Sequence, residues 1–392
     1  MKFTYWILLF VPGLLFAGEW SGYVEGQGRY FIQDALDSDQ PDSTLSIAAQ
    51  PEFFHRWGND RQSLLFIPFA RWDSQDDERS HADIRELIWT YAGNGWESQV
   101  GIGKVFWGVT EALHLVDIIN QTDLVENPDG EQKLGQPMIK LSLERDWGFL
   151  DFYLLPGFRE RTFPGKNGRL RTHPRVDTDL ATYQSSREER HIDLALRWSH
   201  YIGDWDFGLS HFAGTSRDPL FIPTVNSAGE NVLAPHYELI QQTGLDLQAT
   251  KGDWLWKLEA IHRNADSGSY NAATGGFEYT IVGISESAMD VGLLTEYLYD
   301  DREEGNEPPF ENDLFLAFRL TANDVDGSEL LAGVIKDLDS SAGLFNLEAS
   351  RRIGNHWKVS AQARLWFSIP EDDPLYPFHR DDYFEISLQR FF

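Results

Sequence analysis

The chain has 392 residues, no cysteine and a formal net charge of −29. The absence of cysteine excludes disulfides and thiolate metal sites, and the acidic surplus argues against nucleic acid, because phosphate binding needs a basic surface. An acidic chain can be disordered, but 14 Trp, 14 Tyr and 26 Phe argue against disorder, because disordered chains are poor in aromatic residues.

The first predicted element is a short apolar segment near the N-terminus. Met1-Lys2 is followed by an apolar run from Trp6 to Phe16 and then by Ala17-Gly18-Glu19. This order is typical of a secretory signal peptide, and we expect cleavage after Ala17 or Gly18. A membrane-anchoring helix is the alternative, but it would need a run of roughly 20 apolar residues. The predicted division is therefore a signal peptide at 1–17 and one mature domain at 18–392.

A small unit then recurs along the chain: a strand, a tight polar turn with Gly, Asn or Asp, a Trp, and another strand. It occurs at 55–64, 90–100, 143–152, 201–210, 249–259 and 352–361. The connections between these turns are longer and polar, so short and long connections alternate strictly. One rim of short turns with Trp and one rim of long loops are typical of a transmembrane β-barrel. Ordinary hairpins of a soluble β-protein, with the Trp in a core, are the alternative.

The segments between these connections give about 18 predicted strands. An even number places both ends of the mature chain at the rim with short turns. The predicted strands are 20–33, 44–56, 61–72, 81–92, 96–106, 138–146, 148–158, 187–200, 203–214, 237–250, 253–263, 275–285, 288–299, 312–322, 328–338, 342–352, 356–369 and 381–392.

The connection at 107–136 is amphipathic, unlike the other long connections. After Gly108 the period changes from two to roughly 3.6, with Leu113, Val116 and Ile119 on one side. Thr110 can cap such a helix. We therefore expect a short helix that folds into the lumen of the barrel and narrows the pore.

Charged residues gather in and before this connection. We interpret them as a mixed-charge constriction that orients a polar solute, with Asp117 facing the channel; the alternative is that they solvate a surface loop. The predicted constriction residues are Lys104, Glu111, His114, Asp117, Asp123 and Glu126.

The next connection is locally basic, from Arg159 to Arg175. Such a segment could attract an anionic solute or a lipid phosphate, because concentrated charge raises the local concentration of counter-ions. An ordinary solvated loop is an equal alternative.

The late strands alternate most clearly. In 357–367, apolar side chains share one face, while Lys358, Ser360, Gln362 and Arg364 share the other. A dry core would not accept these charges, whereas a water-filled lumen does. Salt bridges across the wall are the simpler explanation for any single charge. The predicted charges of the lumen wall include Arg197, Glu296, Arg319, Arg352 and Arg364.

The last predicted strand, DDYFEISLQRFF, ends in Phe392 with Phe384, Ile386 and Leu388 in register. Together, this C-terminus, the signal peptide, the roughly 18 strands and the loop after the fifth strand resemble porin-type outer-membrane barrels. The nearest layout is that of eighteen-stranded substrate-specific porins and alginate-export barrels. At the level of motifs, the resemblance is carried by GIGKVFWG at 101–108 with the helix expected after it, and by VGLLTEYLYDDR at 291–302.

The resemblance implies an all-β, transmembrane, antiparallel up-and-down barrel in the outer membrane of a Gram-negative bacterium. It implies a channel for passive, selective passage of a small polar solute, and contact with membrane lipids and lipopolysaccharide. It also implies that the barrel-insertion machinery reads Phe392 as a sorting signal. The chain could act as a monomer or a homotrimer.

Two other functions stay open. One is a barrel component of a polymer or lipid export system that works with a periplasmic partner. The other is a membrane-embedded hydrolase, but no G-x-S-x-G, H-E-x-x-H or Walker-type motif is present. Ser210 and His211 are adjacent on a predicted strand and therefore face opposite sides. We expect no enzyme activity, no cofactor and no metal site.

Overall fold

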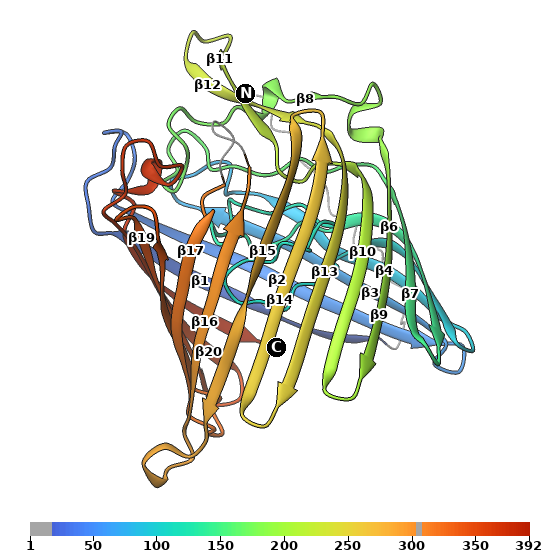
Figure 1. Cartoon of the computed structure of the whole chain (residues 1–392). Helices are drawn as coiled ribbons and strands as arrows, with labels where there is room; N and C mark the ends of the chain where they lie inside the picture. Colours follow the sequence, from blue (N-terminus) through green and yellow to red (C-terminus); the bar gives the residue numbers. More distant parts are fainter. Residues whose placement is uncertain (1–17, 303–307) are drawn as a thin grey trace.

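The computed structural model describes residues 18–302 and 308–392, so the predicted signal peptide at 1–17 lies outside the described residues. The described chain forms a closed antiparallel barrel of 18 strands, as predicted (Figure 1). They are β1 (Glu19–Phe31), β2 (Ser43–Trp57), β3 (Gln62–Asp73), β4 (Ala82–Ala92), β5 (Trp96–Gly103), β6 (Gln136–Arg145), β7 (Gly148–Pro156), β9 (Ile192–Ile202), β10 (Trp205–Thr215), β13 (Leu239–Lys251), β14 (Trp254–Ala265), β15 (Gly268–Ile281), β16 (Asp290–Asp300), β17 (Asn312–Thr321), β18 (Glu329–Asp337), β19 (Gly343–Ile353), β20 (Trp357–Phe367) and β21 (Tyr383–Phe391).

Each barrel strand pairs with the barrel strands before and after it in the chain. The first strand, β1, pairs with β2 and also with β21, from Tyr23 opposite Phe391 to Phe31 opposite Tyr383. This seam closes the sheet, so the barrel has no free edge. Among the described residues, no helix is long and apolar enough to cross a membrane.

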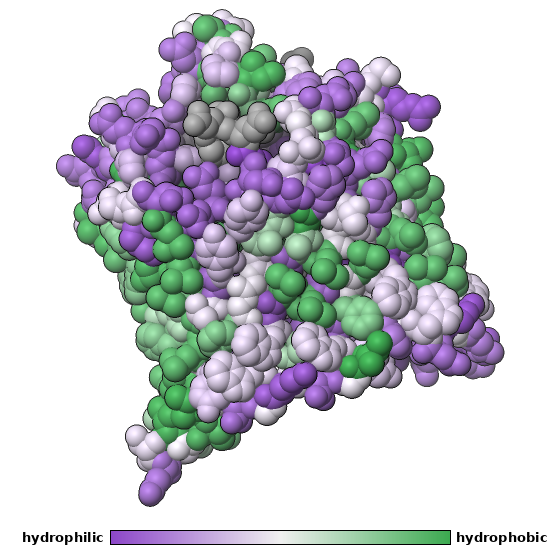
Figure 2. Space-filling model, in the orientation of Figure 1, coloured by the Kyte–Doolittle hydropathy of each residue, from purple (hydrophilic) through white to green (hydrophobic). Residues whose placement is uncertain are grey.

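The wall follows the period of two that the sequence shows. In β21, Tyr383, Glu385 and Ser387 are buried on the inner face, while Phe384 and Ile386 are exposed on the outer face. Figure 2 shows hydrophobic side chains over much of the wall and hydrophilic ones over the loops at the top. A closed wall with an apolar outer face and a polar lumen is the architecture of outer-membrane barrels. The described residues have this architecture.

Most connections at one rim are tight turns. Gly203 joins β9 to β10 and Gly252 joins β13 to β14, each with a φ near +60° that favours glycine. Trp205 and Trp254 follow these turns and are exposed on the outer face. This arrangement agrees with the aromatic rim of a transmembrane barrel.

The other rim differs from the prediction at the connection between β14 and β15. β15 begins at Gly268, where we expected a loop up to Thr274, so only Asp266 and Ser267 separate β14 from β15. The strict alternation of short and long connections is therefore wrong here. The small residues of GSYNAATGG match a loop by composition, but Ala272 and Thr274 are buried on the inner face of a paired strand.

A second sheet stands on the long-loop rim. It consists of β8 (Thr182–Tyr183), β11 (Leu220–Val225) and β12 (Asn231–Tyr237), in the order β11-β12-β8. The hairpin of β11 and β12 projects beyond the barrel (Figure 1). The remaining elements are short 3-10 helices: η1 (Thr178–Leu180), η2 (Glu188–Arg190), η3 (Ile284–Glu286) and η4 (Tyr376–Phe378).

Candidate pore constriction

The segment between β5 and β6, residues 104–135, is here called the inner loop. Its side chains and backbone contact the lumen face of strands that lie far apart around the barrel. Glu126 pairs with Arg71 of β3 at 2.9 Å, and Asp129 pairs with Arg364 of β20 at 2.9 Å. Glu111 pairs with Arg319 of β17 at 2.7 Å. The inner loop is therefore inside the barrel and is fixed to several sides of it.

The helix expected after Gly108 is wrong, because residues 104–135 contain no helical element. Instead, two carboxylates of the wall accept hydrogen bonds from the backbone N–H groups of this stretch. Glu259 of β14 accepts from the N–H groups of Val109, Thr110 and Val116, at 2.7, 3.0 and 3.1 Å. Glu296 of β16 accepts from those of Glu111 and Ala112, both at 2.8 Å. Backbone donors that bind the wall in this way leave an irregular loop rather than a helical ladder.

Apolar residues of the inner loop pack against one side of the wall. Val116, Ile118 and Ile119 are at most 2 % exposed. Burial of such side chains contributes about 1.5–3 kcal/mol each. Together with Trp107 they form a core with residues of strands from β4 to β15: Ile88, Met138, Tyr153, Leu155, Ala195, Phe212, Ile240, Ile261 and Ala272. This side of the lumen is therefore filled.

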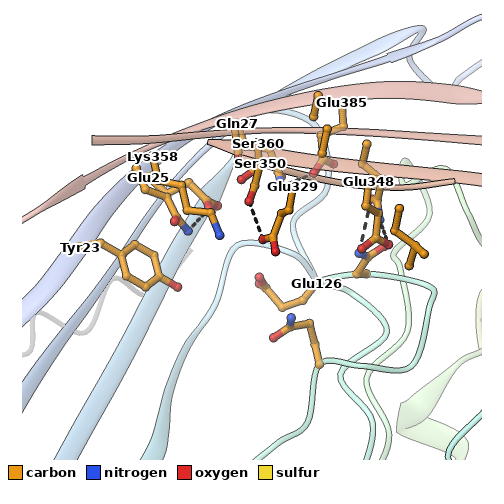
Figure 3. Close-up of a pocket in the computed structure, with 18 of the residues that line it drawn as sticks. Tyr23, Glu25, Gln27, Glu126, Glu329, Glu348, Ser350, Lys358, Ser360 and Glu385 are labelled. Atoms are coloured by element: carbon orange, nitrogen blue, oxygen red, sulfur yellow. Dashed lines mark hydrogen bonds between the residues drawn. The ribbon is translucent and has the colours of Figure 1, made fainter. Parts of the chain in front are cut away.

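The opposite side of the lumen is open. A cavity of about 450 Å³ lies between the inner loop and the wall formed by β17–β21 and β1–β4 (Figure 3). We call it the lumen cavity. Glu126 reaches toward it from the inner loop, facing Glu25, Glu329, Glu348 and Lys358 of the wall. Its other polar lining residues include Gln27, Gln50, Gln132, Ser350, Ser360, Gln362, Ser387 and Gln389.

Of the predicted constriction residues, Glu111 and Glu126 line the lumen cavity. Asp117 instead folds back onto its own loop, where its Oδ1 accepts from the N–H groups of Trp107 and Gly108 at 2.6 and 3.0 Å. Burial raises the pKa of Asp117, although these two donors oppose the shift. Asp123 is fully buried and pairs with Arg85 at 2.6 Å.

His114 and Lys104 belong to the same inner loop. The Nε2 atom of His114 lies 3.1 Å from Glu131, and its Nδ1 atom lies 3.8 Å from Glu259. Burial lowers the pKa of His114, but the two carboxylates outweigh it and raise the pKa to about 10. Burial lowers the pKa of Lys104, which Arg85 lowers further and Glu86 partly restores.

The five predicted wall charges lie on strands whose alternation turns them to the lumen. Arg197 pairs with Asp246 at 2.5 Å, while Glu296, Arg319 and Arg364 contact the inner loop as described. Arg352 lies near the short-turn rim, with its guanidinium 5.8 Å from the ring centre of Phe391. Phe392 is 58 % exposed at the same rim, and its N–H donates to Gly22 at 3.1 Å.

Sequence reasoning missed Glu25, Arg71 and Arg85, whereas it placed Glu259 on the lumen face without a role. Arg71 is flanked by Ala70 and Trp72 in β3, so the period of two already placed it on the lumen face. Arg85 is the extra residue of β4 at a register shift opposite Ile67 and Pro68 of β3. No pattern in the sequence predicted this shift. The role of Glu259 depends on the position of the inner loop and is not visible in β14 alone.

The basic connection forms a second segment over the lumen. Residues 157–177, here called the outer strap, leave β7 and reach across the long-loop rim to the segment before β21. Arg169 pairs with Asp381 at 2.6 Å, and the N–H group of Leu170 donates to the same carboxylate at 2.8 Å. Leu170 packs with Phe31, Trp366 and Tyr383. The other basic residues of the strap are also paired, Arg159 with Asp83, Arg161 with Asp218, Arg171 with Asp37, Arg175 with Asp177 and Lys166 with Glu230.

One group has the composition of a metal site. His81, Asp123 and Glu126 bring their ligand atoms within 4.8 Å of one another. Arg85 pairs with Asp123 and Arg71 pairs with Glu126, so guanidinium groups already neutralise both carboxylates. A cation would have to displace them, and the arrangement is that of an ion-pair network.

No protein-family model and no curated protein sequence matches the chain. Similar solved structures include OmpTdeltaL8, an outer membrane protein of Vibrio cholerae, with 9 % identity, 96 % of this chain and 99 % of that chain covered, and a TM-score of 0.48. A Rh. blastica porin mutant has 12 % identity, coverages of 96 % and 100 %, and a TM-score of 0.47. Pseudomonas putida OprB has 10 % identity, coverages of 96 % and 94 %, and a TM-score of 0.46.

Proposed function

We propose that the chain is an outer-membrane channel for passive, selective passage of a small polar solute, and that the inner loop is its selectivity element. The observation that carries the proposal is the division of the lumen. The inner loop fills the side of β4–β15 and leaves a polar cavity on the other side. Barrels of 16–18 strands are wide enough for an aqueous channel, so a loop that occupies part of the lumen sets the size and charge of what remains.

The proposal is tested by reconstitution of the detergent-purified protein in planar lipid bilayers. We expect discrete conductance steps without any added protein, and reduced current when a solute of the transported class is present. A barrel that is silent until a periplasmic partner is added would contradict the proposal and support the export component instead. Lipid or peptide turnover by the reconstituted protein would support a membrane-embedded hydrolase.

A further inference from the structure

The charged side chains that line the lumen cavity are unequal in number. Six carboxylates line it, from Glu25, Glu111, Glu126, Glu329, Glu348 and Glu385, against four cationic groups from Arg71, Arg85, Arg319 and Lys358. A surplus of fixed negative charge in a water-filled pore favours cations over anions. This surplus determines the selectivity only if the positive charges of the three lining arginines are neutralised by neighbouring carboxylates.

Each lining arginine is held between two carboxylates. Arg71 lies 3.0 Å from Glu25 and 2.9 Å from Glu126. Arg85 pairs in the same way with Asp123 at 2.6 Å and with Asp83 at 3.3 Å. The third, Arg319, lies 2.7 Å from Glu111 and 3.5 Å from Glu278. Each of these groups therefore carries no net positive charge toward the cavity.

Two carboxylates of the lining have mainly neutral partners. Glu329 accepts from the hydroxyl of Ser350 at 2.8 Å. Glu348 accepts from the amides of Asn346 and Gln362, both at 3.1 Å. The nearest cation to Glu348 is Arg364 at 3.8 Å, which is bound more closely to Asp129.

These two carboxylates are close neighbours on the wall. Ser350 is opposite Glu329, and Leu331 is opposite Glu348, so Glu329 and Glu348 are diagonal neighbours on the lumen face of β18 and β19. On β20, Lys358 is the one lining cation without a hydrogen bond or ion pair to any residue within 18–302 and 308–392. Two little-compensated carboxylates thus face one free ammonium group.

We propose that the lumen cavity selects for cations, that Glu329 and Glu348 set this preference, and that solutes with an ammonium or guanidinium group are favoured. The inference deepens the proposed channel function and rests on it. In water, one fixed charge about 6 Å from an ion changes its local concentration by roughly threefold, and two change it by about tenfold at low salt. Lys358 opposes this preference.

The test is the reversal potential of the reconstituted channel in a KCl gradient at low salt. We expect the wild type to favour K⁺ by about tenfold, and Glu329→Gln with Glu348→Gln to lower this preference severalfold. Lys358→Gln should change it in the opposite direction. The matched control is Glu188→Gln with Glu189→Gln, which removes the same charge from the exposed η2 and should leave the ratio near the wild-type value.

A second measurement compares the swelling of protein-containing liposomes in arginine and in glutamate. We expect faster entry of arginine into the wild type and similar rates in the Glu329→Gln, Glu348→Gln variant. A conducting wild type that favours Cl⁻, or a double variant with unchanged selectivity, would overturn this inference and leave the channel function standing. A wild type that does not conduct would overturn the channel function and this inference with it.

Discussion

At the scale of single residues, Glu259 determines the path of the inner loop. It is fully buried and accepts three backbone N–H groups and the hydroxyl of Thr110. Val109 and Thr110 donate to Oε1 and Val116 donates to Oε2. In Glu259→Gln an N–H₂ group replaces one of these oxygens, so at least one backbone donor loses its acceptor, and each buried donor left unpaired costs about 1–3 kcal/mol. We expect faster hydrogen exchange from Val109 to Val116 and a larger conductance. Glu144→Gln, at an exposed wall position, is the control and should change neither quantity.

His114 makes the same loop sensitive to pH. Its pKa is raised to about 10 from the ordinary value of 6.5 by Glu131 and Glu259, against the opposing effect of burial. Its contribution to stability is therefore complete below pH 6.5 and is lost as the pH rises toward 10. We expect the hydrogen-exchange protection of the inner loop, corrected for the intrinsic rate, to fall over this window. In His114→Gln the fall should disappear; a variant that keeps it would assign the titration to another group.

At the scale of elements, the most deeply buried anchor of the outer strap is the ion pair of Arg169 and Asp381. The side chain of Arg169 is 1 % exposed and that of Asp381 is 6 % exposed. Asp381→Asn leaves a buried guanidinium without its counter-charge, which costs about 3–5 kcal/mol. We expect residues 157–177 to become sensitive to protease in the assembled barrel, while the barrel itself stays folded.

The control for the outer strap is Lys166→Gln, which removes the exposed pair with Glu230. Exposed ion pairs contribute little to stability, so this variant should resist protease like the wild type. Equal resistance of Asp381→Asn would show that the packing of Leu170 and the other ion pairs of the strap hold it without this pair.

The strands could be predicted from the sequence because each strand must place apolar side chains on one face and polar side chains on the other. One face of the wall meets hydrocarbon and the other meets water, so residues such as Phe384, Glu385 and Ile386 alternate regardless of what lies elsewhere in the chain. The predicted fold class is confirmed by the closed sheet of 18 strands. β15 was shortened in the prediction because small residues next to a turn match a loop by composition.

The conformation of the inner loop could not be predicted from its own residues. The apolar spacing of Leu113, Val116 and Ile119 is compatible with a helix. In the structure, Glu259 and Glu296 accept the hydrogen bonds that carbonyl groups would accept in a helix, and these two residues belong to strands far along the chain. The same limit applies to Asp117, whose partners are the N–H groups of Trp107 and Gly108. The periodicity of a sequence indicates which side of an element is apolar. It does not indicate which group from a distant strand will accept a hydrogen bond from its backbone.

At the scale of the whole molecule, the predicted role of Phe392 in assembly can be tested separately from stability. Its side chain is 58 % exposed at the short-turn rim, so removing it costs little burial. If it acts as a sorting signal, Phe392→Ala should lower the amount of folded barrel in the outer membrane severalfold, while refolding of the purified chain in detergent is unchanged. Folded barrel is measured by its heat-dependent mobility on gels. Trp357→Ala, another exposed aromatic at this rim, is the control and should assemble normally.

The seam between β1 and β21 also gives experimental access to the closed state. Gly26 lies opposite Leu388, and a side chain added at Gly26 meets no atom within 4 Å. Because the native sequence contains no thiol, a cysteine introduced at each of these two positions has only the other to react with, and cross-strand neighbours are near enough for a disulfide. Oxidation would then link the first and last strands covalently. The fraction of chains with altered gel migration after boiling would measure the fraction of molecules in which β1 and β21 were paired.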